Sequence, residues 1–378
     1  MIKRDTILII GNGFDLAHGM PTSYNDFAQN YLKVIAHSLI NNDFGSIVSP
    51  SFIDFLDAYR WNGPELRRNV NHRALSVLCK DIEDKRQDNI ISFLNGNPSL
   101  IGSVINNRFL AKLYNDSYIN WFDIENAFFE ELVRIKNDIL NPALTHEKQK
   151  ERIHMQKKAL TRLNNELNQI KEALKTYLSS LEIKTNDEIK EFFRSSGLLK
   201  RKFHIINFNY TSTMKSYLDE LFTSHSAHLS LNIHGSLKDK IIFGYGNDHD
   251  HHYQEMKNLG LDEFLENFKT FDYLDNRNYI DYFKNELIRL RSYDVVVMGH
   301  SLDQTDKTLL SKIVNSTACE EIHLLKRGDL SLDKAYKAYR TLLYALSRII
   351  TNDDTLRDKV VNFEDSVSFP QNYIEQVS

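Results

Sequence analysis

The residues best suited to chemistry in this chain each follow an apolar run that is typical of a buried strand. Gly11 and Gly13 follow the first run, Asn209 follows a second and His234 ends a third. A fourth run leads into the polar segment 299–306. In open α/β sheets, ligands bind beyond the carboxyl ends of the strands. If the four runs are neighbouring parallel strands, these residues form one site.

The glycine pair has two interpretations. Glycines between a strand and a helix allow backbone N–H groups to approach the phosphates of a nucleotide closely. The third glycine of the dinucleotide fingerprint is replaced by Leu16, so a plain tight turn is the alternative. Asp15 would repel a phosphate, and it fits better as a partner of a ribose, a base or the loop itself.

Asn209 and His234 are the candidate catalytic side chains. An asparagine beyond a strand end can bind a hydroxyl or position a water, although an Asn turn or helix cap is the alternative. His234 precedes Gly235, which permits a sharp exit from the strand and leaves the imidazole accessible. Imidazole can exchange protons near neutral pH, so His234 is a candidate general base, with a structural histidine as the alternative.

The segment 299–306 opens the next helix with small and polar residues. Ser301 can cap that helix or contact a ligand, and Asp306 can contact a ligand or complement the helix dipole. A cluster of Asp and His at 248–252 could bind metal, but its spacing matches no metal motif, so we interpret it as a polar loop. We predict no metal site.

Composition restricts the class of protein. The 378 residues include 47 basic and 51 acidic residues, so the overall charge gives no argument for nucleic acid or an anionic membrane as partner. The two cysteines, Cys79 and Cys319, can form neither a four-cysteine zinc site nor a disulfide framework. No apolar window approaches the roughly 20 residues of a membrane span. We therefore expect a cytoplasmic protein.

Strand-type runs alternate with helical patterns after residue 202. The expected strands are 6–10, 203–208, 229–233, 241–243, 294–298 and 321–325. The expected helices are 213–222, 279–290, 305–316 and 332–349. This alternation predicts an α/β fold with a doubly wound, mostly parallel, Rossmann-like sheet. Residues 1–30 and 201–378 would form the nucleotide-binding domain.

Residues 31–200 are predicted to form a helical insertion domain. One helix begins near Asn25, capped by Thr22 or Ser23, and another opens at Trp121. Apolar residues recur with heptad spacing between 160 and 181, which indicates a long helix. We expect it to pack within the chain, with a dimer seam as the alternative. Glu125 would be either a buried anchor in this region or a site residue.

Together these motifs resemble the AbiH family of bacteriophage abortive infection proteins. The resemblance extends over most of the chain, and its first and last stretches are the most specific. It implies a role in antiphage defence and a phage-derived trigger. The matching stretches are 9–22, 121–125, 208–211, 233–235, 242–244 and 299–306.

A weaker resemblance is to the sirtuin-like NAD-binding fold. The loop at 11–15, Asn209, the pair His234-Gly235 and the segment 299–301 match its site motifs, which implies NAD or a related nucleotide. Thr211 stands where that fold carries Asp. The four-cysteine zinc module of sirtuin deacetylases is missing, so deacetylation is not expected and no zinc is predicted.

The function predicted from these features is hydrolysis of NAD at its N-glycosidic bond by an abortive-infection effector. Asn209, His234 and Asp15 are the predicted catalytic residues, with Asp15 nearest the developing oxocarbenium. A nucleotide-sensing module without catalysis and a metal-dependent nuclease are the alternatives. A homo-oligomer through the helical insertion is also expected. The predicted NAD-binding residues are Gly11, Asn12, Gly13, Phe14, Thr22, Gly299, Ser301 and Asp306.

Overall fold

The computed structural model describes residues 4–66, 73–116, 120–141, 146–196, 202–221 and 228–371. Its centre is a sheet of five parallel strands in the order β3-β2-β1-β4-β5. The α/β class predicted from the sequence is therefore confirmed. The strands are β1 (Asp5–Ile10), β2 (Phe203–Asn207), β3 (His228–Asn232), β4 (Tyr293–Met298) and β5 (Cys319–Leu324).

The first strand is the centre of the sheet, with two strands on each side of it. Thr6 is in register with Phe203 of β2, and Ile10 is in register with Met298 of β4. Alternate residues of β1 enter separate hydrophobic clusters on the two faces of the sheet. The strand order also reverses at β1, and such a switch point is where open α/β sheets bind ligands.

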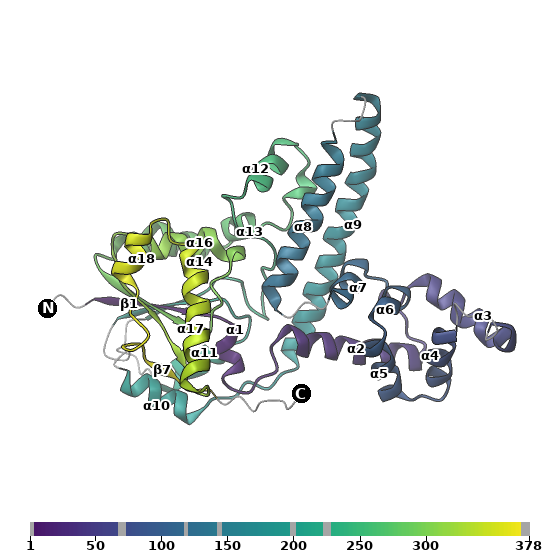
Figure 1. Cartoon of the computed structure of the whole chain (residues 1–378), viewed down its shortest axis with the longest axis horizontal. Helices are drawn as coiled ribbons and strands as arrows, with labels where there is room; N and C mark the ends of the chain where they lie inside the picture. The colour runs from purple at the N-terminus through teal and green to yellow at the C-terminus, as the bar shows by residue number, and fades with distance from the viewer. Residues whose placement is uncertain are drawn as a thin grey trace.

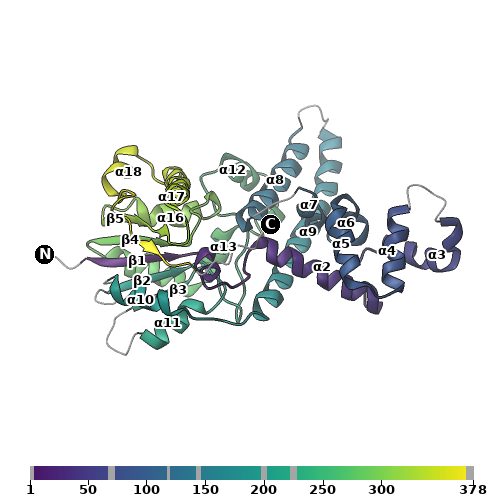
Figure 2. The same cartoon turned by 60° about the horizontal axis from the view of Figure 1, so that its bottom comes forward.

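Helices cover both faces of the sheet (Figure 2). One face packs against α1 (Asn12–Leu16), α10 (Asp187–Ser195) and α11 (Thr213–Leu221). The other carries the segment 277–289 and two longer helices that follow β4 and β5. Their bounds are α14 (Arg277–Asp281), the π-helix η4 (Tyr282–Glu286), α15 (Leu287–Arg289), α16 (Lys307–Val314) and α17 (Leu332–Ser347).

Eight helices lie between α1 and α10 in the described part of the chain, and Figure 1 shows them extending away from the sheet. Ser23 caps the first of them in a capping box with Asp26, as expected from the sequence. The helices are α2 (Tyr24–Asn41), α3 (Pro50–Leu66), α4 (Arg73–Glu83), α5 (Gln87–Gly96), α6 (Pro98–Val104), α7 (Arg108–Asn115), α8 (Trp121–Ile139) and α9 (His146–Ser179).

The heptad positions of α9 are buried within the chain. Leu160, Leu167 and Leu174 share a hydrophobic cluster with Phe128 and Leu132 of α8. Figure 1 shows α8 and α9 side by side as a projecting pair. The expected packing within the chain is therefore confirmed, because the apolar stripe of α9 already has a partner.

The strand expected at 241–243 is wrong. This stretch has no regular secondary structure and pairs with no strand of the sheet. Ile242 N–H donates to the carbonyl of His234, and Gly244 N–H donates to the Glu125 carboxylate. The backbone hydrogen bonds that strand pairing would require are thus made to the carbonyl of a turn and to a carboxylate side chain. Through them, this segment connects the sheet to the helical region.

The remaining elements complete the two regions. Although α10 lies in the predicted insertion, it packs on the sheet, and the predicted boundary at 200–201 lies outside the described residues. The other elements are α12 (His251–Asn258), η3 (Asp262–Phe264), α13 (Lys269–Asp275), η5 (Gln304–Asp306), β6 (Lys326–Arg327), α18 (Asp353–Lys359) and β7 (Ser368–Phe369).

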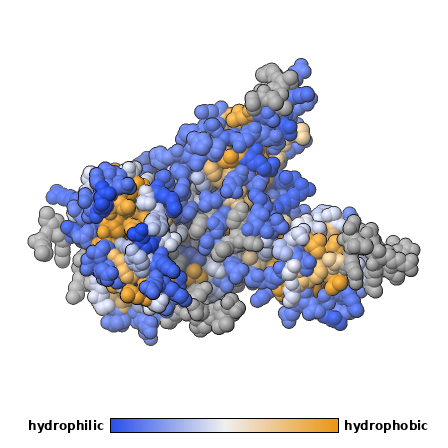
Figure 3. All heavy atoms as spheres, in the orientation of Figure 1, coloured by the Kyte–Doolittle hydropathy of each residue, from blue (hydrophilic) through white to orange (hydrophobic). Residues whose placement is uncertain are grey.

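Much of the surface drawn in Figure 3 is hydrophilic, with hydrophobic residues gathered over α17 and α18 and over the α4–α6 region. Leu332 and Tyr336 of α17 are exposed and contribute apolar surface at one end of that helix. Within the described residues, no helix combines the length and apolar character needed to cross a membrane.

Candidate active site

A cavity of about 260 Å³ opens beyond the carboxyl ends of β1, β2 and β4. The structure brings Gly11, Asn209, His234 and Gly299 into its lining, although they come from four separate parts of the sequence. The parallel sheet explains this convergence, because every strand ends at the same edge. Other predicted site residues in the lining are Asn12, Gly13, Asp15, Thr22, Ser301 and Asp306.

Phe14 is the predicted site residue that the structure places elsewhere. Its side chain is fully buried, and its ring lies edge-on to His18, with a centroid distance of 4.8 Å. It also contacts Tyr217 and Phe369 in the cluster on one face of the sheet. Phe14 therefore anchors α1 to the core and is not one of the residues that line the cavity.

The glycines of the first loop allow it to pack against the loop after β4. A Cβ on Gly11 would lie 2.6 Å from Cα of His300, and one on Gly299 would lie 2.3 Å from N of Phe14. Gly13 N–H donates to the Gly299 carbonyl at 2.8 Å, and Gly11 N–H donates to Met298. These amides are not free to bind a phosphate. The expectation that Gly11 and Gly13 hold a pyrophosphate is therefore not supported.

This contact predicts a large effect of Gly299→Ala. Gly299 has a φ of +71°, and Gly260 has a φ of +66° but no atom near its Cβ position. Gly260→Ala should therefore cost only the backbone strain of a left-handed alanine, about 1–2 kcal/mol. Gly299→Ala should cost about 1–3 kcal/mol more, because the loops must also separate. Urea denaturation of both variants measures the difference, and equal losses would contradict the proposed loop packing.

Asn209 fastens the end of β2 to the first loop. Its Nδ2 donates to the Gly11 carbonyl at 3.0 Å, and its backbone N–H donates to the side chain of Asn207. The carboxamide nitrogen is thus used within the protein, which leaves the carboxamide oxygen for a ligand. The geometry gives Asn209 a positioning role in addition to any contact with substrate.

Asp15 is a buried carboxyl group in the cavity lining. One oxygen accepts a hydrogen bond from the Thr211 hydroxyl at 2.6 Å, and the other, Oδ1, has no partner in the described part of the chain. Burial raises the pKa of Asp15 to about 6, although hydrogen bonds from Thr211 and Thr213 oppose the shift. Thr211, where the sirtuin-like pattern carries Asp, therefore serves to hold Asp15.

The raised pKa of Asp15 predicts a pH-dependent stability. The folded protein holds this proton more tightly than the unfolded chain, so the free energy of unfolding should fall as pH rises from about 4 to 6. The loss is about 3 kcal/mol, because the pKa of Asp15 rises from its usual value near 4 to about 6 on folding. Asp15→Asn should remove this component from urea denaturation measured across that range. Asp187→Asn, at a carboxylate that is 97% exposed in the wild type, should leave the pH dependence of stability unchanged. If Asp15→Asn also left this pH dependence unchanged, the raised pKa would not belong to Asp15.

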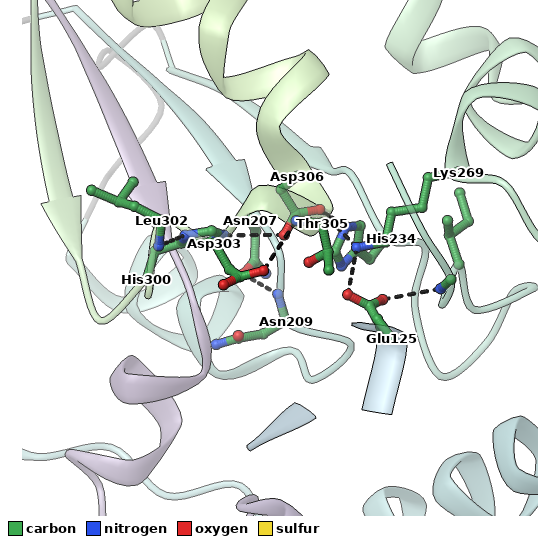
Figure 4. Close-up of polar contacts among 12 residues, drawn as sticks. Glu125, Asn207, Asn209, His234, Lys269, His300, Leu302, Asp303, Thr305 and Asp306 are labelled. Atoms are coloured by element: carbon green, nitrogen blue, oxygen red, sulfur yellow. Dashed lines mark hydrogen bonds and ion pairs between the residues drawn. The ribbon is translucent and has the colours of Figure 1, made fainter. Parts of the chain in front are cut away.

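His234 belongs to a buried network that extends from the cavity into the helical region (Figure 4). Its Nε2 lies 3.0 Å from Asp306 Oδ1, and the same oxygen accepts from Lys269 Nζ at 2.8 Å. Lys269 also donates to Glu125 of α8 at 2.9 Å. The lysine side chain is fully buried, so one cation serves two carboxylates in a region of low dielectric.

The charges of this network follow from its contacts. Burial opposes ionisation of Asp306, but Lys269 and His234 outweigh it and hold the pKa of Asp306 well below its usual range. Burial raises the pKa of Glu125 despite the attraction of Lys269. For Lys269, Asp306 and Glu125 outweigh burial and raise its pKa, so it stays an ammonium ion. An ionised Asp306 can only accept, so the proton of neutral His234 lies on Nε2 and Nδ1 is the basic atom.

His300 is a second buried imidazole beside Asp306. Burial lowers the pKa of His300 to about 4, so the ring is neutral. Leu302 N–H donates to its Nδ1 at 2.9 Å, which fixes the ring proton on Nε2. Leu302 itself has a φ of +58°, a strained conformation for a leucine that holds this loop in a tight turn.

Sequence reasoning missed several residues of this site. Lys269 and Tyr273, whose hydroxyl lies 3.2 Å from His234 Nε2, follow no strand and lie in no motif. Trp121 and Glu125 did carry a signal, because they are one helical turn apart and so share a face. Both line the cavity, and Glu125 is therefore a site residue as well as an anchor.

The segment 248–252 has a structural role. Asp250 caps α12 through the N–H of His252, and Asp248 accepts from Thr270. Among the described residues, the one group with metal-ligand proximity is Asp294, Glu321 and His323 on β4 and β5. Arg4 already pairs with both carboxylates there.

The comparisons agree with the family resemblance of the motifs. A family model described as bacteriophage abortive infection AbiH matches residues 7–326, which include every element of the site. No curated protein and no solved structure matches the chain.

Proposed function

Because this chain belongs to the bacteriophage abortive infection AbiH family, we propose that it is an antiphage effector that binds NAD and hydrolyses its N-glycosidic bond. The observation that carries the proposal is the pairing of His234 with Asp306 in a cavity at the switch point of a parallel sheet. When a carboxylate holds one nitrogen of a histidine ring, the other nitrogen can accept a proton, and this arrangement is typical of a general base.

The proposed reaction breaks the bond between C1′ of the ribose and the nicotinamide nitrogen. The electron pair of that bond leaves with nicotinamide, and positive charge develops on the ribose ring. Water then attacks C1′, and its proton passes to Nδ1 of His234. Asp306 stabilises the imidazolium that forms, and Lys269 keeps Asp306 ionised. The Asn209 oxygen orients the water or a ribose hydroxyl.

The sheet supports a relationship to nucleotide-binding folds. Its strand order, β3-β2-β1-β4-β5, is that of the first five strands of a Rossmann sheet. We propose that the fold is Rossmann-like and distantly sirtuin-like. The departure is in the first loop, where the amides of Gly11 and Gly13 bond within the protein.

A non-catalytic nucleotide sensor is the second candidate. It is favoured by the role of Asn209, whose amide nitrogen holds the Gly11 loop. A phage-derived trigger, a homo-oligomer formed through the helical region and a cytoplasmic location remain proposals. The nuclease alternative has less support, because the potential metal ligands found among the described residues lie on β4 and β5 beside Arg4 rather than in the cavity lining.

Incubation of the purified chain with NAD tests the enzyme proposal. We expect release of nicotinamide and ADP-ribose, detected by chromatography, at a rate that EDTA does not change. Since the proposed chemistry uses only side chains, chelation should also leave the thermal unfolding temperature unchanged. Activity that EDTA abolishes and a divalent cation restores would favour the nuclease alternative. NAD binding without products would favour the sensor.

A further inference from the structure

We propose that this cavity selects a planar organic cation attached to a hydroxylated sugar. In NAD, the planar cation and its sugar are the nicotinamide ring and the ribose attached to it, and the phosphates would lie outside the cavity. This inference rests on the proposed function and names the part of the substrate that is recognised.

The charges of the lining favour a cation. Asp15, Glu125 and Asp306 all line the cavity, whereas the described residues of the lining include no lysine or arginine. Lys269 lies behind them and is shared between Glu125 and Asp306. Lys269 balances the charge of Asp306, so ionisation of Asp15 or Glu125 leaves the lining negative; a ligand with positive charge favours that ionised form and is stabilised by it, and an anionic group is repelled.

Aromatic rings form much of the remaining lining. Tyr24, Trp121, Phe208, Tyr210 and Phe243 all face the cavity. Trp121 is oriented by its indole N–H, which donates to the Thr22 carbonyl at 2.9 Å, and its ring meets Phe243 edge-on. Rings of this kind bind organic cations through their π faces, and Trp does so most strongly. Carboxylates and aromatic rings together make a site for a flat cation.

Unpaired polar atoms indicate that the ligand also carries hydroxyl groups. Asp15 Oδ1, Thr22 Oγ1, Tyr24 Oη and Thr305 Oγ1 are buried, have no hydrogen-bond partner among the described residues and belong to residues that line the cavity. Leaving such a group unpaired costs about 1–3 kcal/mol. A ribose diol supplies donors for Asp15 Oδ1 and both donors and acceptors for the three hydroxyl groups.

The first loop accounts for the exclusion of phosphate. In a dinucleotide-binding turn, backbone N–H groups meet the phosphates. Here the N–H groups of Gly11, Gly13 and Phe14 donate to Met298, Gly299 and Gly11, respectively. The turn that would hold phosphate is instead closed by the loop after β4. Phosphate therefore gains no donors from these amides and meets the carboxylate of Asp15.

A matched pair of ligands tests the charge selectivity. Nicotinamide riboside carries a cationic ring, and reduced nicotinamide riboside has nearly the same shape but a neutral ring. Isothermal titration of the full chain should show the cation binding at least about tenfold tighter than the neutral form. Nicotinamide mononucleotide, which adds a phosphate, should bind no tighter than the riboside. Equal affinity for the charged and neutral ribosides, or a large gain from the phosphate, would overturn the inference.

The two tryptophans of the chain give matched variants. Trp121→Leu should reduce the preference for the cation by about 2–30-fold, whereas Trp61→Leu, at a residue 87% exposed on α3, should leave it unchanged. Product analysis in parallel separates the two proposals. Cation selectivity without release of nicotinamide supports this inference and overturns hydrolysis. Hydrolysis of NAD without cation selectivity supports the enzyme and overturns this inference.

Discussion

His234→Ala is expected to lower the rate of NAD hydrolysis by about 10²–10⁴-fold, the usual contribution of a general base. The imidazole lines the cavity, and its Nε2 is held 3.0 Å from Asp306, so the variant loses the proton acceptor while the cavity remains. Release of nicotinamide by purified protein measures the effect. In infected cells the same substitution should abolish both NAD depletion and protection against phage.

The control is His154→Ala, at an exposed histidine of α9, which should hydrolyse NAD at the wild-type rate. Asn209→Ala should resemble His234→Ala if both residues act on the same water, and the double variant should then be less than additive. Wild-type protection with unchanged cellular NAD, retained in His234→Ala, would refute the enzyme proposal. A folded His234→Ala protein with full activity would place the chemistry elsewhere.

Lys269→Met is expected to reduce the free energy of unfolding by about 3–5 kcal/mol, the effect of removing one partner from a buried ion pair. Lys269 is fully buried and donates to Glu125 at 2.9 Å and to Asp306 at 2.8 Å. Without it, two carboxyl groups from different elements face each other without a counter-ion. Because typical domains have only about 5–15 kcal/mol of stability, this loss should be plain in urea denaturation.

Lys184→Met is the matched control for this prediction. The Lys184 side chain is 60% exposed and its partner Glu182 is 83% exposed, so its loss should cost about 0–1 kcal/mol. The double variant Lys269→Met/Glu125→Gln should recover part of the lost stability, because one uncompensated carboxyl group is removed. A loss in Lys269→Met no greater than in Lys184→Met would contradict the assigned role of the buried ammonium.

Local patterns in the sequence were sufficient to predict the strands of the sheet and the start of α2. The run at 295–298 is apolar throughout because β4 is buried on both faces, and such strands have a continuous hydrophobic sequence. The start of α2 was predicted from Thr22 or Ser23 as a cap, because capping depends on a residue beside the first turn, and the structure selects Ser23. The prediction of a strand at 241–243 was wrong because this run is also apolar and buried. Burial alone does not specify a partner strand.

Parallel topology also allowed part of the site to be predicted. Gly11, Asn209, His234 and Gly299 each follow a strand-type run, so the shared direction of the strands brings them to one edge. This prediction requires only knowledge of where each strand ends. The direction of a side chain within a helix cannot be predicted in this way. The ring of Phe14 is buried in the core, whereas its neighbours Gly13 and Asp15 line the cavity.

The sequence by itself therefore determined the α/β class, the family and the strand-end residues of the site, because these depend on local patterns and on the order of elements. Only the tertiary structure decided the charge of the cavity. Lys269 joins Glu125, 144 positions away, to Asp306, 37 positions away, and no local pattern records such contacts. The partners of the Gly11 and Gly13 amides were likewise decided by packing, because the carbonyl groups of Met298 and Gly299 accept their hydrogen bonds.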